Sequence, residues 1–509
     1  MKNGMKRFFL TIAFGILASP VVVGNDKQPS VLFIAIDDLN DWIGCLGGHP
    51  QALTPNMDRL ASQGILFTNA HCAAPACTPS RTSVFTGQMP NNTGVWANKG
   101  PRLKNTRPDA HLLPHSFQQA GYRTVGTGKL GPNDKCWKTF HKVEQRWSPL
   151  SLEACNYTKR ELPTKGTSKP RHVVNYNGRQ HILPLNGMPS DRTPTDVKGE
   201  SFDWGPFDVP DEEFGDTQIT NWAIQQLREP SQKPLFMGVG YYRPHQPLWA
   251  PARFFKRFQQ SPGQLPQVKA NDLEDLSDIA RNWALLPVTS GTHATVVKFD
   301  QWQAAVEAYL ACVTYVDHEI GRLIDALDES QYANNVTIVV WSDHGWHLGE
   351  KQHWGKWTGW ERSTKVPLII VPPQLKASQF ATAGSRCDQP VNLVDLYPTL
   401  MELCKLKGPG HALDGRSLVP QLKIPSQQED RASITMFDPG NVSVRTNRWR
   451  YIRYEDNSEE LYDLNNDPNE WHNLAMTSLH PSVLRSMRNV AMTHVKAKGT
   501  PNRQAFVDN

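Results

Sequence analysis

Residues 30–38, Ser-Val-Leu-Phe-Ile-Ala-Ile-Asp-Asp, decide the fold. A short apolar run without polar alternation is typical of a strand at the centre of a mainly parallel sheet whose two faces are both covered. Residues 336–344, Val-Thr-Ile-Val-Val-Trp-Ser-Asp-His, repeat the design and again place a carboxylate at the end of the strand. Weaker strand candidates are residues 124–126, 235–239 and 368–371.

Helical patterns separate these strands, at residues 56–63, 217–228 and 303–327. Strands that alternate with helices predict an α/β fold. In open sheets of this class, functional groups collect at the carboxyl ends of the strands, which is where this chain places its acidic residues.

The chain divides into three predicted parts. Residues 1–24 have the layout of a secretory signal, so we expect a soluble mature protein that is secreted or periplasmic. Residues 25–425 carry the α/β pattern, and within them residues 150–215 and 258–300 are expected to form long surface insertions near the site. Residues 426–509 contain a hairpin-like segment and a final helix, which predict a small C-terminal α+β subdomain.

Composition argues against several classes of protein. The net charge of +5 on 509 residues comes without a basic run, so binding to nucleic acid or to an anionic membrane has little support. The apolar stretch of the leader is short and is broken by Gly15 and Pro20, which disfavours a membrane span. Eight cysteines without a Cys-x-x-Cys pair argue against zinc and against a disulfide framework, although Cys136 and Cys155 are close enough in sequence to form a bridge.

Asp37 and Asp38 directly follow a buried strand, where adjacent carboxylates repel each other and burial penalises both charges. A divalent cation would neutralise them. Asp343 and His344 have the same position after the second strand, and a ligand set made mostly of hard oxygens suits calcium or magnesium better than zinc. The alternative is that each pair is a helix cap or a surface cluster of acidic residues.

Cys77-Thr-Pro-Ser-Arg81, followed by Thr86 and Gly87, resembles the sulfatase signature. In that family the cysteine is oxidised to formylglycine by a formylglycine-generating enzyme. The hydrated aldehyde supplies one hydroxyl as nucleophile and keeps the second to expel sulfate. The resemblance implies this role for Cys77, in front of a Pro-Ser-Arg turn; the alternative is a small buried cysteine.

Other segments extend the resemblance over most of the mature chain, to the iduronate-2-sulfatase-like branch of the type I sulfatases. It implies an alkaline-phosphatase-like core, with a mixed, mainly parallel sheet sandwiched by helices, and one Ca²⁺ ion. The implied ligands are Asp37, Asp38, the modified Cys77, Asp343 and His344. The matching segments are residues 36–38, 240–247, 342–350, 354–357, 460–464 and 466–470.

The resemblance also implies roles for single residues. Lys356 and Lys129, together with Ca²⁺, would stabilise the transferred sulfuryl group and the developing oxyanion. Arg81 would orient the hydrate. His245 would protonate the leaving alcohol. The alternatives are solvated surface lysines and a packing histidine.

One departure from the family concerns the residues after Lys129. Relatives carry a Gly-Lys-x-x-His stretch whose histidine helps to expel sulfate, whereas this chain reads Gly-Lys-Leu-Gly-Pro-Asn. His141 would replace that histidine if its loop folds back, and otherwise it is a surface residue.

These features predict a calcium-dependent sulfatase that hydrolyses O-sulfate esters, with sulfated sugars or polysaccharides as the favoured substrates. Two alternatives stay open. One is a phosphodiesterase or phosphonate hydrolase of the same superfamily, and the other is a catalytically impaired protein that binds sulfated glycans, suggested by the missing histidine. Aromatic residues near the motifs would either stack on sugars or pack in the core: Trp249, Trp346, Trp354 and Trp360.

Overall fold

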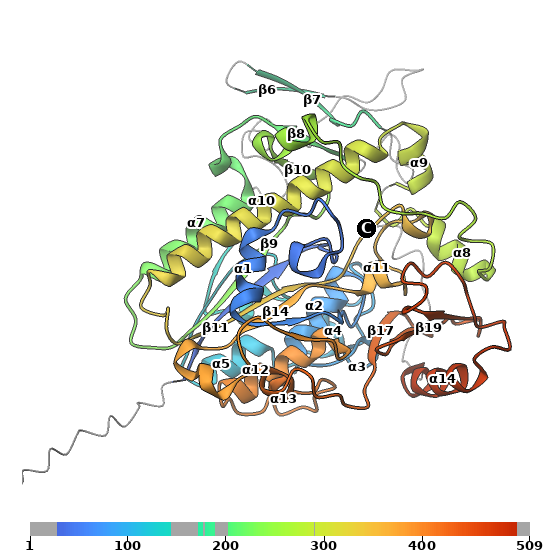
Figure 1. Ribbon diagram of the computed structural model, residues 1–509. Helices are drawn as coiled ribbons and strands as arrows, with labels where there is room; N and C mark the ends of the chain where they lie inside the picture. The colour runs from blue at the N-terminus through green and yellow to red at the C-terminus, as the bar shows by residue number, and fades with distance from the viewer. Residues whose placement is uncertain (1–27, 144–171, 177–178, 189–201, 290, 496–509) are drawn as a thin grey trace, which may run out of the picture.

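The structure is a computed structural model. It describes residues 28–143, 172–176, 179–188, 202–289 and 291–495 (Figure 1). The predicted signal segment and Cys155 lie outside these residues. In the described part of the chain, every helix is too short or too polar to cross a membrane.

An eight-stranded mixed sheet forms the centre of the molecule. Its strands are β1 (Ser30–Ile36), β2 (Ile65–Phe67), β4 (Arg123–Gly128), β5 (Thr139–His141), β9 (Leu235–Tyr241), β11 (Val336–Ser342), β14 (Leu368–Val371) and β15 (Ser385–Cys387). Their order is β15-β2-β14-β11-β1-β9-β4-β5. The run from β11 to β5 is parallel, and β14 pairs antiparallel with both of its neighbours. The predicted mainly parallel sheet is confirmed.

Helices cover both faces of this sheet (Figure 1), which explains why β1 lacks polar alternation. Leu32 and Ile34 face one hydrophobic cluster, whereas Val31 and Phe33 face the other. The first face is covered by α1 (Pro55–Gln63), α7 (Gly215–Arg228) and α10 (Trp302–Asp328), and the second by α2 (Cys77–Thr86), α5 (Leu113–Gln119), α12 (Leu396–Leu403) and α13 (Val419–Lys423).

Short elements connect these layers. They are β3 (Ala70–His71), β6 (His172–Tyr176), β7 (Arg179–Leu183), β8 (Trp204–Phe207), β10 (Leu248–Pro251), β12 (His347–Leu348), β13 (Trp354–Gly355), β16 (Val391–Asn392), α3 (Pro90–Thr93), α4 (Leu103–Thr106), α8 (Asp278–Leu285), α9 (His293–Lys298) and α11 (Glu361–Thr364). The expected insertion at residues 258–300 contains α8 and α9. It also contacts the segment between β20 and α14, since Lys269 donates to the Trp471 carbonyl at 3.0 Å.

The C-terminal subdomain is a four-stranded antiparallel sheet with one helix packed on it (Figure 1). Its elements are β17 (Ser433–Asp438), β18 (Asn441–Arg445), β19 (Trp449–Arg453), β20 (Glu459–Asp463) and α14 (Pro481–Val495). The backbone N–H of Met436 donates to Ala73 at 2.9 Å, and buried Arg450 pairs with Glu361. These contacts attach the subdomain to the segments that flank Cys77 and Lys356.

One local expectation is wrong. Cys77 does not precede a turn but begins α2, because Pro79 lies in the first turn, where a missing backbone N–H removes no helical hydrogen bond. Gly87 then ends this helix in the left-handed region with φ 69°. Cys136 is a free buried thiol, and Cys155, its suggested partner, lies outside the described residues.

The glycine at position 240 permits a close approach between β9 and the segment after β4. A Cβ atom on Gly240 would lie 2.0 Å from the Lys129 carbonyl oxygen, so one of the two backbones would have to move. We expect Gly240→Ala to lower the free energy of unfolding by about 1–3 kcal/mol, measured by chemical denaturation. Gly408→Ala is the matched control, because its nearest neighbour is a flexible methionine at 3.9 Å. Equal effects of the two changes would contradict the steric argument.

Candidate active site

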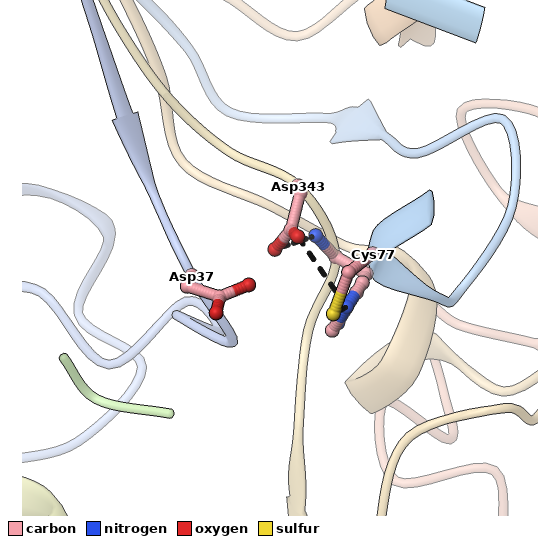
Figure 2. A group of neighbouring side chains, drawn as sticks. Asp37, Cys77 and Asp343 are labelled. Atoms are coloured by element: carbon pink, nitrogen blue, oxygen red, sulfur yellow. Dashed lines mark hydrogen bonds and ion pairs between the residues drawn. The ribbon is translucent and has the colours of Figure 1, made fainter. Parts of the chain in front are cut away.

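Asp37 and Asp38 follow β1, and Asp343 and His344 follow β11, the parallel strand beside it. All four side chains are fully buried. The Asp38 backbone N–H donates to Asp343 Oδ1 at 3.1 Å, which ties the two strand ends together. Figure 2 shows the carboxylates of Asp37 and Asp343 and the thiol of Cys77 directed toward a common space.

Cys77 enters this space from the N-terminal end of α2. Its Sγ lies 3.0 Å from Lys356 Nζ, 3.4 Å from Lys129 Nζ and 3.3 Å from His344 Nε2. The two ammonium groups donate to one atom, an arrangement that suits an oxygen better than a thiol, which is a weak acceptor. His344 Nδ1 lies 3.0 Å from the Gly345 carbonyl, so Nε2 of the neutral ring presents a lone pair to the site. Burial, followed by the charge of Asp37, raises the pKa of this thiol.

Arg81 lies one turn after Cys77 on α2 and bridges the two strand ends. Its Nε donates to Asp343 Oδ2 at 2.8 Å, and its terminal nitrogens reach Asp37 Oδ1 at 3.3 Å and the Leu130 carbonyl at 3.0 Å. Among the contacts between described residues, none joins this guanidinium to the thiol. Arg81 is therefore placed to hold the carboxylates rather than to touch the reacting group.

Two lysines complete the charge balance. Lys129 Nζ forms an ion pair with Asp37. Lys356 Nζ pairs with Asp38 Oδ1 at 2.8 Å and lies 5.6 Å from the centroid of the Trp346 ring. Both lysines thus contact a buried carboxylate and the thiol at once, and neither is a solvated surface residue.

The two neighbouring carboxylates respond differently to burial. Burial raises the pKa of Asp37, but the charges of Lys129 and His245 outweigh it and hold this pKa well below its usual range. Burial raises the pKa of Asp38 to about 7, with Lys356 acting in the opposite direction and the negative charge of Asp37 adding to the rise. The cations of the chain thus leave Asp38 incompletely stabilised as an anion.

The donor set fits a divalent cation. Asp38 Oδ2 is buried, and no described residue donates a hydrogen bond to it. Carboxylate oxygens of this kind are what hard cations bind. Two overlapping groups place their ligand atoms within 4.8 Å of one another: Asp37, Cys77, Asp343 and His344, and Asp37, Asp38, Cys77 and His245.

His245 lies on the loop between β9 and β10. Its Nδ1 contacts the carbonyl of Gln246, so Nδ1 carries the proton and Nε2 faces the site, 3.7 Å from Asp38 Oδ2. Two backbone N–H groups at the start of this loop, those of Tyr242 and Arg243, donate to buried Asp216 at 2.8 and 2.9 Å. The loop is therefore anchored to α7.

The contacts of His141 are with Thr127 and Trp222. His141 Nδ1 lies 3.1 Å from the Thr127 hydroxyl, and its ring stacks on Trp222 at 5.3 Å. No contact between described residues joins it to Cys77 or Lys129. The four tryptophans near the motifs are at most 1% exposed, so they pack in the core.

Sequence reasoning missed the supporting residues. The hydroxyl of Tyr309, on α10, donates to the Asp38 carbonyl at 2.8 Å and accepts from the Asn40 backbone at 3.0 Å. The amide oxygen of Asn98 accepts from the Thr78 backbone at 2.8 Å. Such contacts join residues far apart in the chain and leave no local motif.

Comparisons with known proteins point in one direction. The family model described as Sulfatase matches residues 29–406, and the model for the C-terminal part of N-sulphoglucosamine sulphohydrolase matches residues 349–497. A protein named sulfatase from Formosa agariphila is 34% identical, covering 95% of this chain and 91% of the relative. Human iduronate 2-sulfatase is 28% identical, covering 84% and 80%. A solved structure in complex with its substrate D-glucosamine-2-N,6-O-disulfate superposes with a TM-score of 0.67 at 20% identity, covering 95% and 99%.

We expect Ca²⁺ to stabilise the folded chain through this cluster. A ligand bound only by the native state adds about 2.7 kcal/mol at 100 times its dissociation constant, which calorimetry detects as a higher unfolding temperature. Asp343→Asn should abolish the calcium-dependent rise. The control Asp317→Asn removes a carboxylate that is equally buried but accepts hydrogen bonds from α1, so the rise should persist. An unchanged rise in Asp343→Asn would contradict the assignment.

Proposed function

The chain belongs to the sulfatase family, and we propose that it hydrolyses O-sulfate esters of sugars with a formylglycine made from Cys77 and one bound Ca²⁺. The observation that carries the proposal is the surroundings of the Cys77 side chain. Lys129, Lys356 and His344 all lie within 3.4 Å of its Sγ. The two lysines are donors placed where the oxygens of a converted residue and of a sulfuryl group would need them, and His344 Nε2, with the ring proton on Nδ1, would be available to the cation.

The charges of the site favour an anionic substrate. Three buried carboxylates, Asp37, Asp38 and Asp343, face three cationic side chains. These are Lys129, Lys356 and Arg81, and Arg81 forms ion pairs with both Asp37 and Asp343. A divalent ion added to this balanced set leaves an excess of positive charge. Attraction between that excess and a sulfate group strengthens in a site that excludes water.

Ca²⁺ would be held by Asp37, Asp38, converted Cys77, Asp343 and His344. It would supply positive charge to a sulfate oxygen. The converted residue would supply a hydrated aldehyde as nucleophile. The remaining work falls to side chains that the structure already holds in place.

Lys129 and Lys356 both contact the Cys77 side chain. From these positions their ammonium groups would bind the oxygens of a sulfuryl group attached to the converted residue. Arg81 keeps Asp37 and Asp343 at a fixed separation, so it orients the site without touching the substrate. His245 holds one proton on Nδ1, against the Gln246 carbonyl; to act as the acid it would take up a second proton on Nε2 and give that proton to the leaving sugar oxygen.

The histidine that relatives carry after the lysine corresponding to Lys129 is missing here, and in the family it helps to release sulfate. We propose that His141 takes no part in this step, because its ring is held by Thr127 and Trp222. A protein impaired in this step would bind sulfated glycans without releasing sulfate, and one of the related phosphonate-cleaving type would prefer phosphorus esters. Turnover of matched sulfate and phosphate esters separates these outcomes.

Sulfated sugars are the proposed substrate class. Iduronate 2-sulfatase, a relative over most of the chain, is named for a sulfated sugar. We further propose that the mature protein is exported, because residues 1–24 have the layout of a secretory signal, and that a formylglycine-generating enzyme matures it.

Conversion of Cys77 is tested by peptide mass spectrometry on protein co-expressed with a formylglycine-generating enzyme. We expect the Cys77 peptide to show the mass of the aldehyde, and converted protein to release sulfate from sulfated sugars. Cys77→Ala should lose at least about 10³-fold in turnover, because no nucleophile remains. An unconverted thiol in protein that still binds sulfated oligosaccharides would favour the binding-protein alternative.

The acid role of His245 is tested with two leaving groups. His245→Ala should reduce turnover of sugar sulfates by about 10²–10⁴-fold, whereas activated aryl sulfates should lose far less because their leaving oxygen needs little protonation. His141→Ala is the control and should leave both rates unchanged. Equal losses on both substrates would contradict the acid role of His245.

A further inference from the structure

His353 makes two contacts that a neutral histidine cannot satisfy. This fully buried side chain places Nδ1 2.7 Å from the Ala284 carbonyl oxygen and Nε2 2.8 Å from the Lys356 carbonyl oxygen. A carbonyl oxygen only accepts hydrogen bonds. Both contacts are hydrogen bonds only when both ring nitrogens carry a proton, which makes His353 an imidazolium ion.

The position of Ala284 favours a cation there. Ala284 lies in the last turn of α8, where the carbonyls have no partner within the helix. The N–H of Val288, which would complete the helical pattern, donates to the Leu286 carbonyl at 2.8 Å instead. The carboxyl end of a helix carries partial negative charge, so a positive ring at this point is stabilised.

A neighbouring histidine shows what a neutral ring requires. The ring of His347 lies 5.0 Å from that of His353 and is equally buried. Its Nδ1 lies 3.0 Å from the Glu350 carbonyl, but its Nε2 lies 3.0 Å from the hydroxyl of Thr358, which donates as well as accepts. The neutral form of His347 therefore satisfies both contacts, and only His353 needs a second proton.

The titratable groups that face His353 are His347 on β12 and His293 on α9, and the pKa of each is lowered by burial and by His353. The only group of α8 in hydrogen-bond contact with the His353 ring among the described residues is the Ala284 carbonyl. Lys356 lies on the same segment as His353, but its ammonium group pairs with Asp38. Burial lowers the pKa of His353 below its ordinary value, and its two carbonyl bonds oppose that shift only in part, so the second proton is inferred from the two carbonyl contacts. Among described residues, no carboxylate forms an ion pair with this ring.

We propose that His353 is a positioning residue that, when doubly protonated, ties the Lys356 segment to the end of α8. The tie holds Lys356 Nζ 3.0 Å from Cys77 Sγ and 2.8 Å from Asp38. Loss of one proton leaves a nitrogen lone pair facing a carbonyl lone pair, so one contact opens and Lys356 loses its support. This inference rests on the role of Lys356 in the proposed function. If His353 supports Lys356 only when doubly protonated, kcat will fall as the pH rises through the pKa of His353.

The protonation state is measured directly by NMR on the whole protein with ¹⁵N-labelled histidine. Long-range ¹H–¹⁵N correlations distinguish a doubly protonated ring from either neutral tautomer. The signal is assigned by its loss in His353→Gln, or by its proximity to the His347 ring if that variant does not fold. We expect two protonated nitrogens at the pH of full activity. A neutral ring at that pH would overturn the proposal.

The kinetic test compares His353→Gln with the neighbouring control His347→Gln. We expect His353→Gln to lower kcat by about 10–100-fold with little change in KM, and to remove the decline of kcat that follows the pKa of His353, while the decline caused by loss of the acid proton of His245 remains. The control should keep the native pH profile. A native profile in His353→Gln would overturn the proposal. The NMR measurement needs no turnover, so it tests the protonation of His353 even if the protein is inactive. Failure of the proposed function would instead be seen as unconverted Cys77 in mass spectrometry.

Discussion

Three carboxylates buried at the ends of two adjacent parallel strands are the constraint on which the rest of the structure depends. Asp37, Asp38 and Asp343 have no exposure to water, and an unpaired charge in such a place costs several kcal/mol. The chain meets this cost with cations brought from separate elements. Each of those elements must be held firmly, because a cation displaced by about 1 Å loses much of its effect.

The supports of these cations reach far from the sheet edge. Arg81 is carried by α2, whose first residue is Cys77, so one helix positions both the thiol and the bridge between strand ends. Lys356 follows a short hairpin that contacts α8 through His353. The insertion that carries α8 also contacts the C-terminal segment through Lys269. Regions outside the central sheet thus take part in placing the reactive groups.

Local pattern was sufficient for much of the fold. β1 and β11 were predictable because helices cover both faces of the sheet, and that burial requires apolar residues at every position. α2 was not, since Pro, Ser and Arg near its start are typical of a turn, and its buried surroundings come from distant segments. The sequence also left the location of His141 open, because that location depends on how β5 pairs with β4 at the edge of the sheet. This pairing brings the His141 ring to the Thr127 hydroxyl.

The sequence by itself determined which chemical groups follow the strands, because a short apolar run followed by carboxylates is a local pattern that needs no information from distant residues. Through the resemblance to a family, it also predicted roles for Cys77, Lys129, His245 and Lys356. Only the tertiary structure decided which cation meets which carboxylate, that Asp38 Oδ2 accepts no hydrogen bond from the described residues, and that His353 lies between two carbonyls. The physical reason is distance along the chain: Asp38 and Lys356 are separated by 318 residues, and only the packing of strands and helices brings them within hydrogen-bond range.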